Sequence, residues 1–375
     1  MKPDYEKSIV NLMSSIIEHF QGQPKYPALK NFKINSENVV LLVLDGLGTD
    51  SLMKLPKSSI LRKNYQQDLT SVFPSTTATG VTTFLTGLSP QDHAVTGWYM
   101  QMKEFASVVK ILPYTTKVNK KQIKYDFNPS LPEPMFKQIK ANSYVVSDKM
   151  LFESKYNNFM NEGAEQVPVK TLTSFVNKIV TVVKKKGSNY VYSYLPDYDS
   201  VCHDFGKNSK EAKKTLLMLN DVVTMLVKKL KGTNTELIIT ADHGQIETNK
   251  KKVCFLMDHP QLKECLSQAI CGEPRVVYCY VHPRKVKQFE NYVNKRLKDV
   301  CTLHCSEDLV NEGYFGKSKQ SHPELLNRIG DYTLILKENQ IIRDTLDNVE
   351  EWDIGNHGGT SKEEMIVPLI KIKIN

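Results

Sequence analysis

Long hydrophobic runs are missing from this chain of 375 residues. No stretch reaches the roughly 18 consecutive apolar residues that a membrane span needs, so we expect no span. We also expect no secretory signal, because Asp4 and Glu6 precede the first apolar residues and polar residues interrupt those that follow. The apolar residues between Ile9 and Phe20 recur at helical spacing, which predicts an amphipathic helix packed on the domain.

The sequence also lacks the marks of disulfide-rich and nucleic-acid-binding proteins. Its seven cysteines are an odd number without an even set of short spacings, which favours free thiols in a reducing compartment, and we expect the cytoplasm. No Arg-rich arm or basic aromatic motif indicates a nucleic-acid polymer as partner. The net charge of +9 is spread over short lysine clusters, which are either solvated surface or a mild positive field that attracts anionic substrates.

What the chain does contain is a series of short apolar runs, rich in β-branched residues and separated by helical stretches. The clearest runs predict strands at 38–44, 188–195, 235–240 and 365–372. Runs that are apolar on both faces are typical of buried strands in a mostly parallel sheet. Between them, residues 209–230 place leucines and valines on one helical face, with Ser209 as the predicted N-cap. This alternation predicts an α/β layered fold, with a mostly parallel central sheet flanked by helices.

The domain organisation follows from length and from a change of pattern. A chain of 375 residues can form one large core with an inserted subdomain, or two domains. From about 245 to 350 the pattern changes to cysteines and short mixed runs, before the chain returns with the last strand. We therefore predict a core of residues 1–244 and 351–375, and a smaller, cap-like α+β subdomain inserted at 245–350.

Aspartate and histidine residues follow three of the predicted strands. Asp45 follows the first strand, Asp199 and His203 follow the second, and Asp242 and His243 follow the third. Taken singly, each is also what a turn or a helix cap produces. The carboxyl ends of strands in an open α/β sheet face one crevice, so we expect these side chains to form one site. Carboxylate oxygens and imidazoles suit Zn²⁺ or Mn²⁺.

Two further segments supply a histidine and a hydroxyl group. His357 lies among glycines at 355–359, where the backbone can approach other groups closely. Thr76 and Thr77 follow a proline and precede a run that can be helical, which places a hydroxyl at a helix N-terminus. Free N–H groups and the helix dipole favour a phosphate there. An ordinary helix cap uses the same residue types, so both segments are informative only together with the others.

In this order and spacing, the segments resemble the type I phosphodiesterase and nucleotide pyrophosphatase family of the alkaline phosphatase superfamily. The resemblance covers roughly residues 38–100, 188–245 and 352–372. In that family the nucleophilic Thr or Ser lies nine residues before a Thr-Gly pair, and here Thr86-Gly87 points back to Thr77. The other family motifs match Asp199-x-x-x-His203, Asp242-His243-Gly244 and Asn356-His357-Gly358. The resemblance implies an alkaline-phosphatase-like layered fold.

The resemblance also implies a role for each residue at the site. The six Asp and His side chains would bind two divalent metal ions, the first by Asp199, His203 and His357 and the second by Asp45, Asp242 and His243. Zinc is the family's usual metal, and manganese is the alternative. Two adjacent cations can stabilise both the attacking and the leaving oxygen of an in-line displacement. The expected reaction forms a phospho-threonine at Thr77 that water then hydrolyses, with Thr76 as the alternative nucleophile.

Three positions depart from the family pattern, and two of them concern the substrate. The aromatic residue that usually follows the nucleophile is Ala78 here, and the Asn that usually binds a phosphate oxygen is replaced by Trp98. A usual His-Gly pair is His93-Ala94. Trp98 and Tyr99 are candidate substrate contacts that would supply an aromatic wall, and a core position for Trp98 is the alternative.

We therefore expect a metal-dependent hydrolase of phosphodiester or pyrophosphate bonds in nucleotides or related small phosphodiesters. A phosphomonoesterase or a phosphonate hydrolase on the same two metals is the second hypothesis, and a catalytically silent binding module is the third. A sulfatase is not expected, because the sequence contains no Cys-x-Pro-x-Arg segment. The oligomeric state is not predicted by any of these patterns.

Overall fold

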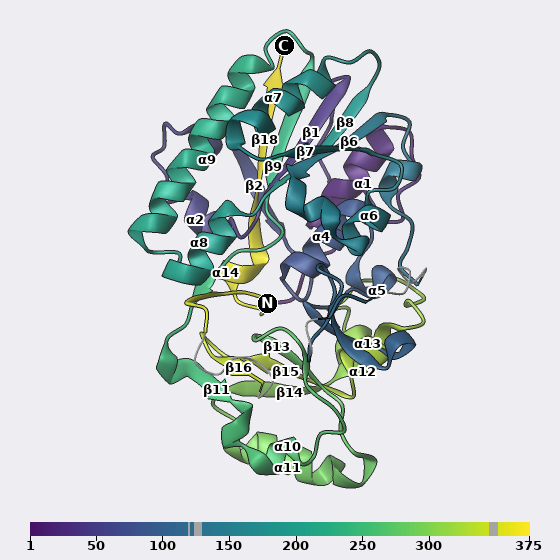
Figure 1. Cartoon of the computed structure of the whole chain (residues 1–375), viewed down its shortest axis with the longest axis vertical. Coiled ribbons are helices and arrows are strands. Elements are labelled where there is room, and N and C mark those ends of the chain that lie inside the picture. Colours follow the sequence, from purple (N-terminus) through teal and green to yellow (C-terminus); the bar gives the residue numbers. More distant parts are fainter. Residues whose placement is uncertain (119–120, 124–129, 345–351) are drawn as a thin grey trace.

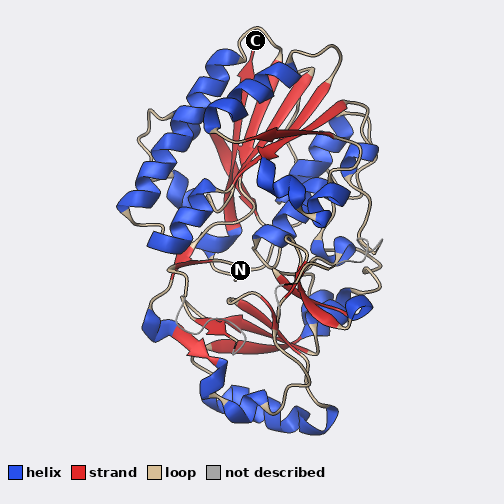
Figure 2. Ribbon diagram, viewed as in Figure 1, coloured by secondary structure: helices blue, strands red, loops and turns tan. Residues whose placement is uncertain are grey.

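The structure is a computed structural model of the chain, and it describes residues 1–118, 121–123, 130–344 and 352–375. Two parts follow one another along the long axis of the molecule, and each is built around a seven-stranded sheet (Figure 1). The larger part has helices on both faces of its sheet, as an α/β layered fold does (Figure 2).

The sheet of the larger part is mostly parallel, as predicted. In spatial order its strands are β2 (Tyr65–Thr70), β18 (Ile366–Ile374), β9 (Thr235–Thr240), β1 (Asn38–Leu44), β8 (Asn189–Leu195), β6 (Asn142–Asp148) and β7 (Glu165–Val169). The five strands from β9 to β7 run parallel, and β18 runs antiparallel to both of its neighbours. Every residue of β1, β8 and β9 is buried, which explains why these three strands are mainly apolar on both faces.

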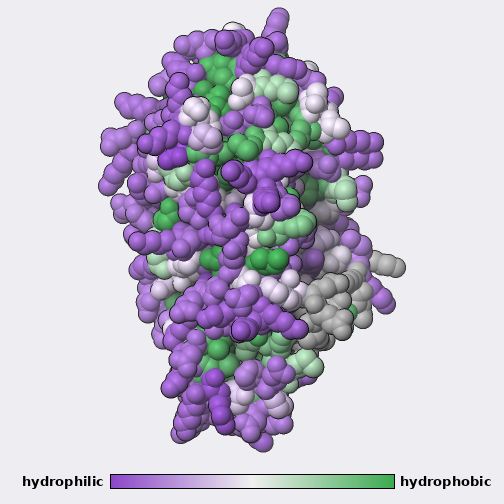
Figure 3. All heavy atoms as spheres, turned by 90° about the vertical axis from the view of Figure 1, so that its left-hand side faces the viewer, coloured by the Kyte–Doolittle hydropathy of each residue, from purple (hydrophilic) through white to green (hydrophobic). Residues whose placement is uncertain are grey.

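The helices of this part divide between the two faces of the sheet. In Figure 1, α7 (Leu172–Val183), α8 (Asp197–Phe205) and α9 (Lys210–Lys229) lie on one side, and α1 (Ile9–His19) and α4 (Thr77–Thr86) lie on the other. The predicted cap is confirmed, because the Ser209 side chain accepts a hydrogen bond from the Ala212 N–H at the start of α9. The side of the molecule that carries α9 is mainly hydrophilic, with small separate apolar patches (Figure 3).

Helix α1 is more deeply buried than an amphipathic surface helix. Its polar residues Asn11 and Ser14 are fully buried. Each has a partner, since Asn11 donates to the Pro27 carbonyl and Ser14 donates to the Val10 carbonyl. The polar residues that interrupt the apolar pattern are thus internally hydrogen-bonded and do not mark a solvent-facing side.

The second part contains an antiparallel sheet drawn from two regions of the chain. In spatial order its strands are β14 (Cys301–Cys305), β15 (Tyr332–Leu336), β13 (Val276–Cys279), β12 (Cys271–Gly272), β3 (Tyr99–Met102), β4 (Ser107–Lys110) and β5 (Thr115–Thr116). Helices α11 (Val286–Arg296), α12 (Ser306–Asn311) and α13 (Leu325–Ile329) belong to this part. Because β3 to β5 join the sheet, this part is larger than the segment 245–350. The boundaries at 244 and 351 stay a prediction, and residues 345–351 lie outside the described residues.

Two short strand pairs tie the departing chain to the returning one. Strand β10 (Ile246–Glu247) pairs with β17 (Gly355–Asn356), and β11 (Val253–Phe255) pairs with β16 (Ile341–Arg343). The first pair matters for the site, because it holds the segment before His357 against the segment that follows His243.

Cysteines occur in both parts of the molecule. All seven cysteines are free, in agreement with the expected thiols. Within the described part of the chain, no helix is long and apolar enough to cross a membrane.

Candidate active site

Three adjacent strands of the large sheet bring the predicted metal ligands together. Strand β1 lies between β9 and β8, so the residues that follow these strands meet at one edge. Asp45 comes directly after β1, and Asp242 and His243 follow β9. Asp199 and His203 lie four residues apart on α8, on one side of the helix, as their spacing predicted.

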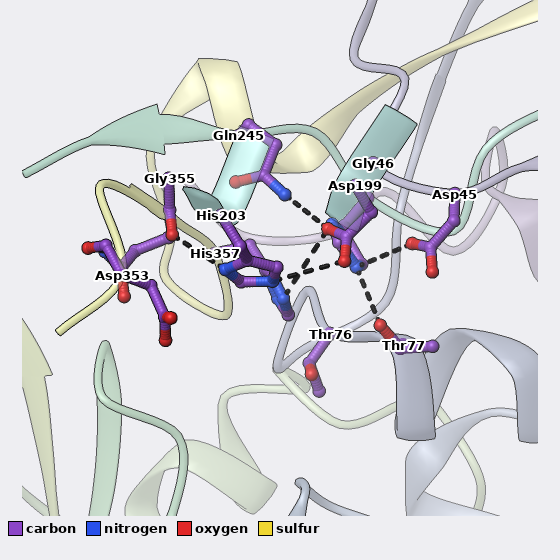
Figure 4. Close-up of polar contacts among 12 residues, drawn as sticks. Asp45, Gly46, Thr76, Thr77, Asp199, His203, Gln245, Asp353, Gly355 and His357 are labelled. Carbon is purple, nitrogen blue, oxygen red and sulfur yellow. Dashed lines mark hydrogen bonds and ion pairs between the residues drawn. The ribbon is translucent and has the colours of Figure 1, made fainter. Parts of the chain in front are cut away.

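The nucleophile candidate reaches this edge from the other side. Thr77 is the first residue of α4, and its Oγ1 lies 3.1 Å from the His243 Nε2. Gly80, one turn further on, permits the close approach, since a Cβ there would lie 2.6 Å from the Asp242 Cβ. Thr77 is directed toward the cluster, whereas Thr76 is turned away from it (Figure 4).

The side-chain atoms of the six candidate ligands converge on one small volume. The His243 Nε2 lies 3.3 Å from the Asp45 Oδ1 and 3.6 Å from the Asp242 Oδ2. The Asp199 carboxylate lies 3.2 Å from the His203 Nε2 and 3.9 Å from the His357 Nε2. The two groups join through their imidazoles, because the His243 and His357 rings are stacked with centroids 3.7 Å apart.

Unpaired carboxylate oxygens are a second indication of a metal centre. The buried Asp45 Oδ1 and Asp242 Oδ2 have no hydrogen-bond partner among the described residues. Buried carboxylate oxygens are normally hydrogen-bonded. The His243 Nε2 lies beside both without a hydrogen bond to either, and a divalent cation would satisfy these oxygens. The candidate ligands form two sets, and within each set the ligand atoms lie within 4.8 Å of one another. The first set is Asp199, His243 and His357, and the second is Asp45, Asp242 and His243. His203 is absent from the first set, although it lies beside Asp199.

Neighbouring groups orient the candidate ligands. The His203 Nδ1 lies 2.8 Å from the Gly355 carbonyl, and the His243 Nδ1 lies 3.0 Å from the Gly244 carbonyl. A carbonyl partner holds the proton on Nδ1 and leaves Nε2 free for a cation. Tyr194 donates to Asp45, and Gln245 donates to Asp199.

Burial and charge set the protonation of the cluster. Burial, followed by the charges of Asp199 and Asp242, raises the pKa of Asp45 well above its usual value. Burial by itself would lower the pKa of His203, but the Asp199 carboxylate outweighs it and raises that pKa to about 9. Three buried carboxylates in one place therefore create a site that favours cations.

Glu273, Tyr194 and Gln245 are site residues that the sequence did not predict. Glu273 follows β12 in the second sheet, and its Oε1 accepts from the Thr76 hydroxyl and from the Trp98 N–H, both at 2.6 Å. Burial raises the pKa of Glu273 to about 7. Gln245 could have been suspected from its place directly after Asp242-His243-Gly244. Nothing local marks Glu273 or Tyr194.

A cavity of about 420 Å³ opens beside Thr77 and Asp199. Its wall is mainly apolar and includes Val81, Leu85, Trp98, Leu112, Met150 and Phe152. Trp98 is half-buried and thus takes part in both the cavity wall and the packing below it. Tyr99 does not line this cavity, and the centre of its ring lies 4.6 Å from the Nζ of Lys117, the residue after β5. The structure brings Trp98 to the site and places Tyr99 away from it.

Comparison with known proteins decides the family. The sequence model of the type I phosphodiesterase / nucleotide pyrophosphatase family matches residues 39–360. The chain belongs to this family. Members of the family are metal-dependent hydrolases, and the predicted resemblance is confirmed.

Two curated relatives show how distant the similarity is. Human ectonucleotide pyrophosphatase/phosphodiesterase family member 1 is 26% identical over 260 residues, which is 63% of this chain and 26% of the relative. Venom phosphodiesterase 2 of Crotalus adamanteus is 22% identical over 234 residues, covering 59% of this chain and 28% of that protein. The chain thus spans only about a quarter of the length of these relatives.

Solved structures support the fold. An inactive form of murine ectonucleotide pyrophosphatase/phosphodiesterase 5 in complex with AMP superposes with a TM-score of 0.68 at 18% identity, covering 88% of this chain and 87% of that one. Phosphonoacetate hydrolase from Sinorhizobium meliloti, in complex with phosphonoformate, gives 0.63 at 16% identity and covers 90% of both chains. The expected alkaline-phosphatase-like layered fold is confirmed.

Proposed function

We propose that this chain hydrolyses small phosphodiesters through a phospho-threonine formed at Thr77. One observation carries the proposal. The Thr77 hydroxyl lies 3.1 Å from the His243 Nε2, at the edge where the six candidate ligands converge. Membership of the phosphodiesterase family supports the same reaction.

The ligands are assigned in the same way as in the family. Asp199, His203 and His357 would hold one divalent ion and Asp45, Asp242 and His243 the other, with zinc as the first choice and manganese as the second. When bound, such ions make a threonine alkoxide accessible at neutral pH and offset the charge of a phosphate.

The chain's own residues then perform a double displacement. The Thr77 Oγ1 attacks phosphorus, forming a new O–P bond while the bond to the leaving oxygen breaks and the alcohol departs. Water next cleaves the Thr77 O–P bond, which restores the hydroxyl and releases a phosphate monoester. Thr76 is the weaker candidate, because its hydroxyl is engaged by Glu273 on the far side of the loop.

The cavity beside Thr77 favours an uncharged group on the substrate. Among the residues that line this cavity, none is Lys or Arg. A nucleoside or another uncharged, largely apolar ester group fits such a wall, and AMP is bound by the murine relative. The second candidate is a phosphonate hydrolase, supported by the likeness in fold to phosphonoacetate hydrolase. The carboxylate of phosphonoacetate would find no cationic side chain in this wall.

A substrate panel tests the proposal. Zinc-loaded protein is assayed with bis(p-nitrophenyl) phosphate, p-nitrophenyl phosphate, the p-nitrophenyl ester of thymidine 5′-monophosphate, and phosphonoacetate. We expect the two diesters to be hydrolysed fastest. Faster release of phosphate from phosphonoacetate would favour the second candidate, and no turnover of any compound by metal-loaded protein would indicate a silent binding module.

The nucleophile is tested by two matched substitutions. Thr77→Ala should lower diester hydrolysis by at least about 10³-fold, because the hydroxyl that forms the intermediate is gone. Thr181→Ala, the same change on the exposed face of α7, should leave the rate unaltered. Full activity of the Thr77 variant would reject the assignment.

A further inference from the structure

The hydroxyl group of Thr76 does not cap the helix that it precedes. Thr76 is the N-cap residue of α4, with extended backbone angles of φ −137° and ψ 154°. A threonine in this position ordinarily accepts a hydrogen bond from an N–H of the first turn. Thr171, before α7, does so by accepting from the Ser174 N–H. At Thr76 this bond is missing, and the hydroxyl donates to the Glu273 Oε1 instead.

Glu273 is held in the position that makes this possible. Its side chain is buried, with 7% of the residue exposed, and it comes from the turn between β12 and β13. The same Oε1 accepts from the Trp98 N–H, which anchors the carboxylate independently of Thr76. Its stem packs on Gly358, where an added Cβ would lie 2.9 Å from the Glu273 Cβ. The Glu273 side chain therefore reaches both loops, with its carboxylate on the residue before Thr77 and its stem on the residue after His357.

The first turn of α4 is left with free N–H groups. The first N–H groups of a helix have no partner inside the helix, and they carry the positive end of its dipole. A capping hydroxyl would occupy one of them. Since Thr76 is drawn toward Glu273, its side chain leaves this turn uncapped, and the turn begins at the proposed nucleophile.

We propose that Glu273 is a positioning residue, which draws the Thr76 hydroxyl away from α4 so that the N–H groups of its first turn bind the phosphate of the substrate. The inference rests on the proposed function, because it assumes that a phosphate binds beside Thr77. Glu273 itself touches no reacting atom and acts through Thr76.

Binding of inorganic phosphate to zinc-loaded protein, measured by titration calorimetry, tests this role. In Glu273→Leu the hydroxyl of Thr76 is released and can cap the helix, so phosphate affinity should fall about five- to tenfold, the size of one N-cap interaction. Thr76→Val alone should change the affinity by less than about twofold, since it leaves no hydroxyl to compete.

The double variant separates positioning from simple structural support. Combining Glu273→Leu with Thr76→Val removes the competing hydroxyl, and phosphate affinity should return to within about twofold of the wild type. If Glu273 only supports the loop, the double variant binds phosphate as weakly as Glu273→Leu or more weakly, and the inference is overturned while the proposed function stands. Absence of phosphate binding by the zinc-loaded wild type would also overturn the inference, whereas the proposed function is decided separately by the substrate panel.

Two further variants guard against a folding defect. Glu273→Gln keeps an oxygen acceptor of the same reach and should bind phosphate within about twofold of the wild type, whereas an equal loss in the Gln and Leu variants would contradict the inference. Glu273→Ala carries the same expectation as Glu273→Leu, should the leucine side chain be too large for the turn. Zinc content and melting temperature are measured for each protein.

Discussion

Removal of the metal ions from the proposed site should lower the thermal stability of this protein. Asp45, Asp199 and Asp242 are 2%, 8% and 0% exposed, and their carboxylates share one small volume. Without cations their charges are desolvated and repel one another. Burial and the charges of the other two carboxylates therefore raise the pKa of Asp45. A chelator should therefore destabilise the folded state relative to the metal-loaded protein.

The size of the effect follows from linkage between binding and folding. A ligand that binds only the folded state adds about 2.7 kcal/mol when its free concentration is 100 times the dissociation constant, so two sites add about 5 kcal/mol. For 375 residues the entropy of unfolding near 60 °C is about 0.8 kcal/mol/K. Dividing the first quantity by the second predicts a fall in melting temperature of about 7 °C.

Scanning calorimetry of zinc-loaded and chelator-dialysed protein, with metal content measured on the same samples, gives the shift directly. His243→Ala should show a much smaller shift, because His243 faces both groups of candidate ligands. His304→Ala, which alters a histidine of the second sheet, should show the full shift. Melting curves that coincide after the metal has been removed would refute the reasoning.

Three other substitutions probe the surroundings of the site. Trp98→Ala removes the aromatic part of the cavity wall and should raise the KM for diesters, measured by steady-state kinetics, about tenfold. An unchanged KM would indicate that Trp98 has only a core packing role. Gly80→Ala places a Cβ 2.6 Å from the Asp242 Cβ and should lower diester hydrolysis about 100-fold with loss of zinc. Unchanged activity and zinc content would show that the helix can shift to make room for the methyl group. Glu364→Gln breaks a buried ion pair with Arg275 and should cost about 3–5 kcal/mol in urea unfolding at pH 7. Burial opposes the ionisation of Glu364, but Arg275 outweighs it and lowers its pKa. The stability from this pair is therefore complete above the unfolded pKa of about 4.5 and is lost as the pH falls through the folded value, so the difference between variant and wild type should shrink below pH 4.5.

The sheet and the candidate ligands could be predicted because their signals are local. Strands β1, β8 and β9 are mainly apolar, and an aspartate of the site follows each one within four residues. The topology of parallel strands then dictates that Asp45, Asp199 and Asp242 meet at one edge.

Contacts between the two parts could not be predicted in this way. Glu273 reaches the nucleophile loop only because β3 joins β12 in the second sheet, and no local pattern announces a pairing of strands about 170 residues apart. The same pairing explains Tyr99, which shares the strand β3 with residues of the second sheet and faces Lys117. The pattern of α1 did not reveal how deeply this helix is buried. Its polar residues interrupt the apolar positions, and they can be buried because their hydrogen-bond partners lie on their own helix or on the following loop.

Anomalous diffraction from crystals of the zinc-loaded protein tests the central claim most directly. Two peaks are predicted, one bounded by Asp199, His203 and His357 and the other by Asp45, Asp242 and His243, with the Thr77 oxygen beside the second. A single peak, or zinc bound elsewhere while these six side chains stay empty, would contradict the account.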